Sequence, residues 1–365
     1  MRELTISSSS GDCRAVIFTE GDELYTDMLK HVRAAHTSVR LECYIFGNDG
    51  IGGEFAEALM ERARAGVRVQ LHLDAFGSLP FAMSEWPGQL REAGVELRWF
   101  NPWRITRLLS LNRRNHRKLL VVDDEKAWLG GFNLHEESSR RYHDVQCWRD
   151  THLRMDGRLA SEAAEFFDRL WRGERRWQPA TPDESGTYLV SNQNLRQLHR
   201  FRRLLKLRMR NARRRIWLTT PYFMPDHATQ KAMAEAARRG IDVRLLTPFK
   251  TDQRIAQWAA RAAYAKLLEA GARIYEYRPR ILHAKTAVID DDWCTIGTAN
   301  LNYRSFFVNY ELNLISDCKA LAMALAEIFE QDLEDSREVT ERAWKRRGWT
   351  WRATELIGWL ARRYL

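Results

Sequence analysis

The chain has 365 residues, of which 58 are Lys or Arg and 48 are Asp or Glu, which gives a formal net charge of +10. Hydrophobic residues make up 45% and charged residues 29%, which excludes a globally disordered chain, and the length suggests about two domains. Because no run of about 18 uncharged apolar residues occurs, we predict no transmembrane helix. The basic excess suits an anionic partner, either nucleic acid or an anionic membrane surface. A GC-rich genome that encodes many Arg is the alternative explanation.

The cysteines and the N-terminal residues indicate a reducing compartment. Five cysteines, at positions 13, 43, 147, 294 and 318, include no C-x-x-C pair. An odd number without this spacing argues against a disulfide framework and against a structural zinc site. The first residues contain no apolar signal core. We therefore expect a cytosolic protein, or one bound to a membrane from the cytosolic side.

The first predicted elements form a strand–helix–strand unit that recurs in the second half of the chain. Residues 38–46 (SVRLECYIF) predict a strand, residues 54–65 a helix that ends at Gly66, and residues 67–73 (VRVQLHL) a second strand. The second copy has a strand at 215–223 (RIWLTTPYF), a helix at 228–239 that ends at Gly240, and a strand at 241–247 (IDVRLLT). A further pair of similar segments lies at 90–100 and 267–277. The repetition indicates that the chain contains the same fold twice.

Alternating strands and helices at this spacing predict an α/β fold with largely parallel strands covered by helices. We expect two similar domains, residues 1–180 and 186–365, separated by the turn-rich segment 178–186 (QPATPDESG). Packing about a pseudo-two-fold axis would bring equivalent residues of both domains into one active site at their interface.

One pattern inside the repeat contains the candidate catalytic residues. It reads H-x-K-x4-D and occurs twice, at His116, Lys118 and Asp123 and at His283, Lys285 and Asp290. A glycine stands 14 residues after each histidine, and a nearby Asn follows, Asn133 or Asn300. Eight residues after each of these glycines comes a serine, Ser138 or Ser305. Two occurrences in equivalent places argue against ordinary strand residues.

The spacing brings the reactive groups to one face of a strand. Side chains alternate along a strand, so a histidine and a lysine two residues apart point the same way. Each half then supplies an imidazole, an ammonium group and an amide, and cations and amides stabilise charge on phosphate oxygens. One histidine can attack phosphorus while the other protonates the leaving oxygen. We therefore predict a phosphate centre, with the two asparagines and the two serines as phosphate-binding residues.

The doubled motif resembles that of the phospholipase D superfamily. The closer resemblance, over almost the whole chain, is to bacterial cardiolipin synthases, and it is carried by NHRKLLVVDDEKAWLGGFN (115–133), TTPYFMPD (219–226) and LHAKTAVIDDDWCTIGTANLNYRSFFVNYELN (282–313). It implies two phospholipase D-like α/β/α domains and a ping-pong phosphatidyl transfer that uses no metal or other cofactor. Some members have N-terminal membrane helices that this chain lacks, so the chain is most similar to the soluble, membrane-associated branch.

The resemblance implies one histidine that forms a phosphatidyl-histidine and another that acts as general acid and then base. We assign His116 as the nucleophile and His283 as the acid, although the duplication allows the opposite order. The nucleophile must be neutral and the acid protonated, so their pKa values must be split. Asp150 and Glu311, which align with each other in WRDTHLRM and NYELNLIS, are the candidates for orienting the histidines by accepting from Nδ1. The two motif aspartates lie at strand ends, which favours structural anchors over proton carriers.

Three segments concentrate the basic charge. Residues 101–118 have six cations and no acid, residues 195–215 have ten cations and no acid, and residues 337–365 combine eight cations with four Trp. Arg beside Trp and Leu in the first and last segments favours an anionic membrane surface, and packing on the domain is the alternative. The middle segment has apolar residues at helical spacing, which indicates a core-packed helix with a solvated basic face.

We predict an enzyme that condenses two phosphatidylglycerols to cardiolipin and releases glycerol, bound peripherally to the cytoplasmic side of a bacterial inner membrane. Hydrolysis of phospholipids by the same site is the first alternative, because the motif does not select between water and a lipid alcohol. A nuclease is less favoured because no nucleic-acid-binding module is recognisable, and a scaffold is least favoured because both motif copies are intact. The expected partners are phosphatidylglycerol and the membrane surface, with no nucleic acid and no oligomer required for the active site.

Overall fold

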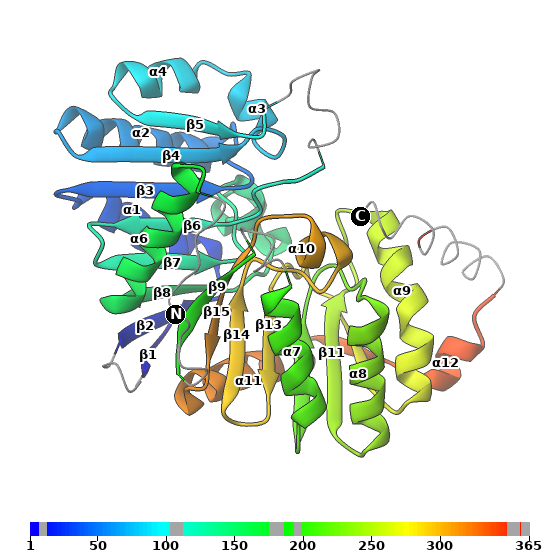
Figure 1. Ribbon diagram of the computed structural model, residues 1–365. Coiled ribbons are helices and arrows are strands. Elements are labelled where there is room, and N and C mark those ends of the chain that lie inside the picture. The colour runs from blue at the N-terminus through cyan, green and yellow to red at the C-terminus, as the bar shows by residue number, and fades with distance from the viewer. Residues whose placement is uncertain (7–12, 103–111, 175–185, 193–198, 349–357, 359–365) are drawn as a thin grey trace.

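The computed structural model describes residues 1–6, 13–102, 112–174, 186–192, 199–348 and 358 (Figure 1). Parts of the sequence predictions lie outside these residues: the boundary stretch at 178–185, residues 103–111 of the first basic segment, residues 195–198 of the second, and residues 349–357 and 359–365 of the third. Within the described residues the chain forms two eight-stranded sheets, one from each half.

The first sheet contains both parallel and antiparallel strands. Its order is β1 (Arg2–Ile6), β2 (Cys13–Phe18), β8 (His152–Asp156), β7 (Lys126–Gly130), β6 (Leu119–Val122), β3 (Ser38–Cys43), β4 (Arg68–Asp74) and β5 (Glu96–Phe100). Strands β3, β4 and β5 are parallel, and the other neighbouring pairs are antiparallel.

The second sheet repeats this arrangement. Its order is β16 (Ser336–Val339), β12 (Arg273–Tyr277), β11 (Asp242–Pro248), β10 (Arg215–Thr219), β13 (Thr286–Ile289), β14 (Trp293–Gly297), β15 (Leu312–Ser316) and β9 (Tyr188–Ser191). Here β10, β11 and β12 are parallel, and the motif strand β13 pairs antiparallel with β10 as β6 pairs with β3. The predicted duplication is therefore confirmed at the level of strand order and direction.

The prediction of largely parallel strands is wrong, because each motif strand belongs to a hairpin. Strands β6 and β7 pair antiparallel across a short turn that contains Asp123 and Asp124 in the left-handed region, with φ of 53° and 58°. Asp290 occupies the same conformation after β13, with φ of 55°. Asp tolerates this region better than most residues, so the turn can be tight. The hairpin sends the chain back along the sheet, which makes most neighbouring pairs antiparallel.

Helices cover both faces of each sheet. The long helices of the first half are α1 (Gly21–Arg33), α2 (Gly50–Arg64) and α6 (Arg158–Trp171), and those of the second are α7 (Arg200–Asn211), α8 (His227–Arg238), α9 (Arg254–Glu269) and α11 (Lys319–Glu334). Shorter ones are α3 (Leu79–Ala82), α4 (Trp86–Glu92), α5 (Arg140–His143), α10 (Tyr303–Phe307) and α12 (Glu341–Lys345). The repeat helices α2 and α8 are each followed by a glycine in the left-handed region, Gly66 (φ +87°) and Gly240 (φ +83°), as the helix-end prediction required.

A shared core holds the two halves together. Helices α1 and α2 pack with β3 and β4 on the outer face of the first sheet, and α7, α8 and α9 cover the outer face of the second. A further cluster takes its members from both halves, among them Phe166 and Phe167 of α6 and Leu325 and Phe329 of α11. The inner faces of both sheets contribute to the same cluster, so apolar burial fixes one half against the other. In the described part of the chain, no helix has the length and apolar character needed to cross a membrane.

Candidate active site

The two motif histidines lie where the halves meet. His116 stands just before β6 and His283 just before β13, at the sheet ends where the parallel strands finish. The backbone N–H of His116 donates to the carbonyl of Tyr310 over 2.9 Å, and that of His283 donates to the carbonyl of Arg149 over 2.7 Å. Each bond crosses from one half to the other, so each histidine is held by the main chain of the opposite half.

Tyr310 and Arg149, which supply these carbonyls, are each followed in the sequence by a carboxylate residue that was predicted to orient a histidine. Glu311 Oε2 lies 3.0 Å from Nδ1 of His116, and Asp150 Oδ2 lies 2.6 Å from Nδ1 of His283. Both carboxylates are buried. The contact therefore runs across the interface in both directions, and it places the proton on Nδ1 and leaves Nε2 of each ring for chemistry.

Burial lowers the pKa of both histidines. The pKa of His283 falls to about 3, first because the ring is buried and then because the Lys285 charge lies beside it, and Asp150 offsets only part of this. The pKa of His116 is also lowered, chiefly by burial, against the attraction of Glu311. With a pKa of about 3, His283 is neutral in the free protein near pH 7, so the protonated acid that the predicted mechanism requires is not present there. A phosphate against either ring would raise the pKa of that ring by attraction between charges.

The two motif lysines lie behind the histidines and are buried. Lys118 Nζ donates to the carbonyl of His116 over 3.0 Å, and Lys285 Nζ donates to that of His283 and lies 3.7 Å from Asp150. Burial lowers the pKa of Lys118 to about 7, with a further contribution from the charge of Lys285. Burial likewise lowers the pKa of Lys285 to about 8. Two buried ammonium groups this close to each other favour an anion nearby.

The motif asparagines line the same cavity as the histidines. Asn133 follows β7 and accepts the backbone N–H of Ile45 through Oδ1 over 3.2 Å. Asn300 follows β14, and its Oδ1 is buried without a hydrogen-bond partner. Both side chains line the cavity, and their contact with a phosphate stays a prediction.

The motif serines do not reach the cavity, so the predicted phosphate-binding role does not fit their positions. Ser305 Oγ donates to Oε1 of Glu311 over 2.7 Å and accepts the backbone N–H of Asn300 over 3.1 Å. Ser138 Oγ lies 3.4 Å from Nε2 of His135. Both serines are buried, and their hydroxyls contact protein groups behind the cavity. Ser305 therefore positions Glu311 and the Asn300 backbone.

The motif aspartates lie at the far ends of their strands, so the geometry gives no support to their inclusion among the catalytic residues. Asp123 accepts the backbone N–H groups of His36, Thr37 and Ser38 over 2.8–2.9 Å. Asp290 accepts those of residues 213–215 in the same way. These contacts fasten the motif hairpin to the start of the neighbouring strand, which matches the expected anchor role.

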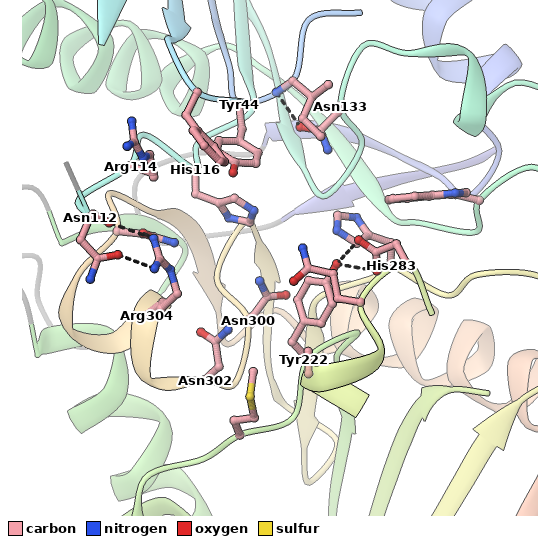
Figure 2. Close-up of a pocket in the computed structure, with 18 residues that line it drawn as sticks. Tyr44, Asn112, Arg114, His116, Asn133, Tyr222, His283, Asn300, Asn302 and Arg304 are labelled. Atoms are coloured by element: carbon pink, nitrogen blue, oxygen red, sulfur yellow. Dashed lines mark hydrogen bonds between the residues drawn. The ribbon is translucent and has the colours of Figure 1, made fainter. Parts of the chain in front are cut away.

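A cavity of about 340 Å³ opens between the halves (Figure 2). Aromatic rings that sequence reasoning missed pack beside the histidines: Tyr44 has its ring centroid 5.1 Å from that of His116, and Trp148 lies 5.1 Å from His283. Tyr222 lies 6.1 Å from His283. The two tyrosines follow equivalent strands of the repeat, in SVRLECYIF and RIWLTTPYF, but they are offset by one position, so the alignment of the copies did not pair them.

The cavity also contains charged residues that the sequence did not single out. Arg114 and Arg304 lie at one end, and Asp252 lies elsewhere on the wall, where it accepts from the hydroxyl of Tyr222 over 2.7 Å. Among the described residues, no group of three His, Cys, Asp or Glu side chains is arranged to hold a metal ion.

Comparison with known proteins places this site in a family. The family described as "Cardiolipin synthase, PLD-like domain" matches residues 28–171 and 205–333, one segment in each half. A cardiolipin synthase of Halalkalibacterium halodurans is 32% identical over 93% of this chain and 70% of its own length, and cardiolipin synthase 2 of Bacillus anthracis is 35% identical over 90% of this chain. The chain spans 66% of that second relative and 62% of a cardiolipin synthase of Geobacillus kaustophilus.

Solved structures show the same fold at low sequence identity. The phosphatidylserine synthase of Haemophilus influenzae superimposes with a TM-score of 0.74 at 13% identity and covers 100% of this chain and 97% of that one. A polyphosphate kinase from Porphyromonas gingivalis gives a TM-score of 0.62 over 90% of this chain and 49% of its own. With its duplicated motif, its two matching sheets and its relatives over most of its length, the chain is an enzyme of the cardiolipin synthase family within the phospholipase D-like proteins.

Proposed function

We propose that this enzyme transfers a phosphatidyl group from one phosphatidylglycerol to another, which forms cardiolipin and releases glycerol. The observation that supports this best is the pair of histidines that line one cavity, each with Nδ1 held by a carboxylate of the other half. Two imidazoles with free Nε2 atoms are what a two-step displacement at phosphorus requires. The names of the relatives supply the substrate class.

The reaction proceeds through a covalent phosphatidyl-histidine. In the first step Nε2 of His116 forms a bond to phosphorus, the bond from phosphorus to the glycerol oxygen breaks, and His283 gives its proton to that oxygen. In the second step His283 takes the proton from a hydroxyl of the second phosphatidylglycerol, whose oxygen displaces His116 from phosphorus. Asn133 and Asn300 contact the phosphate oxygens, and the buried ammonium groups of the motif lysines stabilise the charge that develops on them. Water in place of the second lipid would give phosphatidic acid.

The same proposal includes peripheral binding to the cytoplasmic face of a bacterial membrane. A large apolar side chain of the cavity wall is exposed: Phe76 is 50% exposed, and Met83, seven residues further along the chain, is 80% exposed. Ile255, 44% exposed, neighbours the cavity-lining Ala256 on the other half. Exposed apolar groups around a phosphate site suit contact with acyl chains. All five cysteines are free and buried, which suits the reducing side of the membrane.

The transfer reaction is tested by incubating the purified chain with phosphatidylglycerol vesicles and measuring lipids by mass spectrometry. Cardiolipin and glycerol should appear in equal amounts. His116→Ala and His283→Ala should each lower the rate by about a thousandfold or more, because each removes a group that forms or breaks a bond. The matched control is His36→Ala, since His36 is exposed and its side chain lies outside the cavity. Phosphatidic acid without cardiolipin would overturn transfer and favour hydrolysis.

The order of the two histidines is tested with a phosphatidyl ester of nitrophenol. Nitrophenolate leaves without a proton, so the variant that lacks the acid still completes the first step. His283→Ala should release one nitrophenol per protein and retain the labelled phosphatidyl group, whereas His116→Ala should release none. The reverse result would exchange the two roles.

Membrane contact is tested by vesicle sedimentation of Met83→Ser, with Met323→Ser as the control. Met323 is 45% exposed and lies on α11, so the control removes an exposed methionine from another surface. The first change should lower the bound fraction severalfold and the control should not. Equal binding by both variants would contradict membrane contact through Met83.

A further inference from the structure

One end of the cavity has two guanidinium groups that have no counterparts at the other end. Arg114 stands two residues before His116, where the second motif has Ile281 two residues before His283. Arg304 stands directly before Ser305, where the first half has Glu137 before Ser138. Figure 2 shows both arginines on the same side of His116. The duplicated site is therefore symmetric in its histidines and asymmetric in its charge.

Arg114 is a buried cation whose charge is only partly compensated. It is 7% exposed, lines the cavity, and has Nη1 buried without a hydrogen-bond partner. The nearest carboxylate oxygen, Oδ1 of Asp74, is 3.8 Å away and already accepts the backbone N–H groups of Phe76 and Gly77. A buried donor without an acceptor is costly, so this guanidinium is suited to an anionic ligand.

Arg304 is held in place by amide groups. Its Nη1 donates to Oδ1 of Asn112 over 2.5 Å, and its Nη2 donates to the carbonyl of the same residue over 2.8 Å. Burial lowers the pKa of Arg304, and the charge of Arg114 lowers it further, so the two cations are near enough to repel each other. A ligand that takes both guanidinium groups would remove this repulsion. Arginine's planar fork is suited to the oxygens of a phosphate.

We propose that Arg114 and Arg304 form a subsite for a second phosphate, the phosphodiester of the acceptor lipid. This inference rests on the proposed function, in which one phosphate reacts at the histidines while the acceptor carries another. In the acceptor, a three-carbon glycerol separates the attacking hydroxyl from its own phosphate, so both groups enter one cavity together. The subsite favours an anionic glycerophospholipid over water or a neutral alcohol, and it thereby directs the phosphatidyl-histidine toward transfer.

The subsite is tested by competition between two soluble acceptors, glycerol and glycerol 1-phosphate, with phosphatidylglycerol as the donor. The wild-type enzyme should transfer to glycerol 1-phosphate in preference to glycerol. Arg114→Gln should lower this preference by about tenfold or more, because it removes a charged hydrogen bond to the phosphate. Arg114→Lys should recover part of the preference. The control is Arg113→Gln, which removes one positive charge from an exposed neighbour outside the cavity and should leave the preference unchanged.

A binding measurement decides the inference without turnover. Titration calorimetry with glycerol 1-phosphate should give a Kd about tenfold weaker for Arg114→Gln than for Arg113→Gln, at equal melting temperature. The same Kd in both variants would overturn the subsite even if the enzyme makes cardiolipin. Wild-type enzyme that transfers to no lipid or alcohol would overturn the proposed function, whereas a weakened Kd would still support the anion subsite.

Discussion

The two sides of the active site contain the same histidine and lysine but support them differently. On the His116 side, Oε2 of Glu311 also accepts the hydroxyl of Thr298 over 2.5 Å, and Oε1 accepts that of Ser305 over 2.7 Å. On the His283 side, Asp150 has a shorter side chain, and Lys285 Nζ lies 2.8 Å from Nδ1 of the histidine itself. The difference indicates that the duplicated halves kept the reacting atoms and diverged in the groups that hold them.

One glycine makes this difference possible. Thr298 corresponds to Gly131 in the first half, and a Cβ at Gly131 would lie 2.0 Å from Oδ1 of Asp150. The hydroxyl that fixes the carboxylate on one side thus has no room on the other. Neutral hydroxyl donors surround Glu311, whereas a cation lies beside Asp150, which is a physical basis for unequal behaviour of the two histidines.

Removal of either carboxylate should have the largest effect. Asp150→Asn and Glu311→Gln keep the shape and remove the charge, so the histidine loses the acceptor that fixes its tautomer. We expect kcat for product formation from phosphatidylglycerol to fall by roughly 10²–10⁴-fold in each variant. The control is Glu137→Gln, because the Glu137 side chain is about half exposed and lies outside the cavity. If the carboxylate variants kept the control's rate, the orienting role would be excluded.

The pH dependence should separate the lysines from the histidines. Lys118 and Lys285 have pKa values of about 7 and about 8, so their positive charge is lost as the pH rises through this range. We expect kcat/KM to fall with rising pH there, up to about tenfold per pH unit, whereas kcat falls later because bound phosphate raises both pKa values. A profile of kcat/KM that stays flat from pH 7 to pH 9, roughly the range set by these pKa values, would contradict a role for these ammonium groups.

The effect of the same lysines on stability has the opposite sign. Their pKa values lie below the ordinary 10.5, so the unfolded chain binds more protons than the folded one between about pH 7 and 10.5. The free energy of unfolding should therefore rise with pH across this window. Lys118→Met should remove part of that slope and should not lower the melting temperature at pH 7, because it removes a buried charge.

The motif aspartates should give the smallest change in activity and a clear loss of stability. Asp123→Ala removes an acceptor of three backbone N–H groups, so we expect a free energy of unfolding lower by about 1–2 kcal/mol. Below the melting transition kcat should be unchanged, because Asp123 lies at the far end of β6. Denaturant unfolding beside Asp291→Ala, whose carboxylate pairs with the side chains of Arg214 and Arg215, provides the comparison. A loss of kcat in a stable Asp123 variant would mean that Asp123 also affects the geometry of the active site.

The fold followed from the repeats, but the direction of the strands did not. Strand and helix positions came from apolar patterns and from the glycines after the repeat helices, which local physics determines. Antiparallel pairing of the motif strand depends on a tight turn with two aspartates at positive φ. An alternating pattern of helices and strands does not report such a turn, so the sequence prediction of parallel strands failed there.

The reacting groups were predicted better than the groups around them. A histidine and a lysine two residues apart recur in equivalent places of the repeat, so local spacing was sufficient to find them, although both pairs stand just before β6 and β13 and not on the strands as predicted. The partner of each carboxylate depends on how the halves pack, and alignment within the repeat could not show that Glu311 contacts His116. Ser305 has the spacing of the motif, but its hydroxyl donates to Glu311 behind the cavity wall and does not face the cavity. Arg304 was missed because nothing in the first half repeats it.

The main-chain bonds across the interface have a consequence for biosynthesis. His116 is translated long before Tyr310 and Glu311, which supply the carbonyl for its amide and the carboxylate for its ring. A nascent chain that ends anywhere before Tyr310 therefore carries the first histidine without the groups that fix it. The arrangement of His116, its backbone acceptor and its carboxylate can therefore form only after synthesis has passed Glu311, so the two halves must both be made before either side of the cavity is complete.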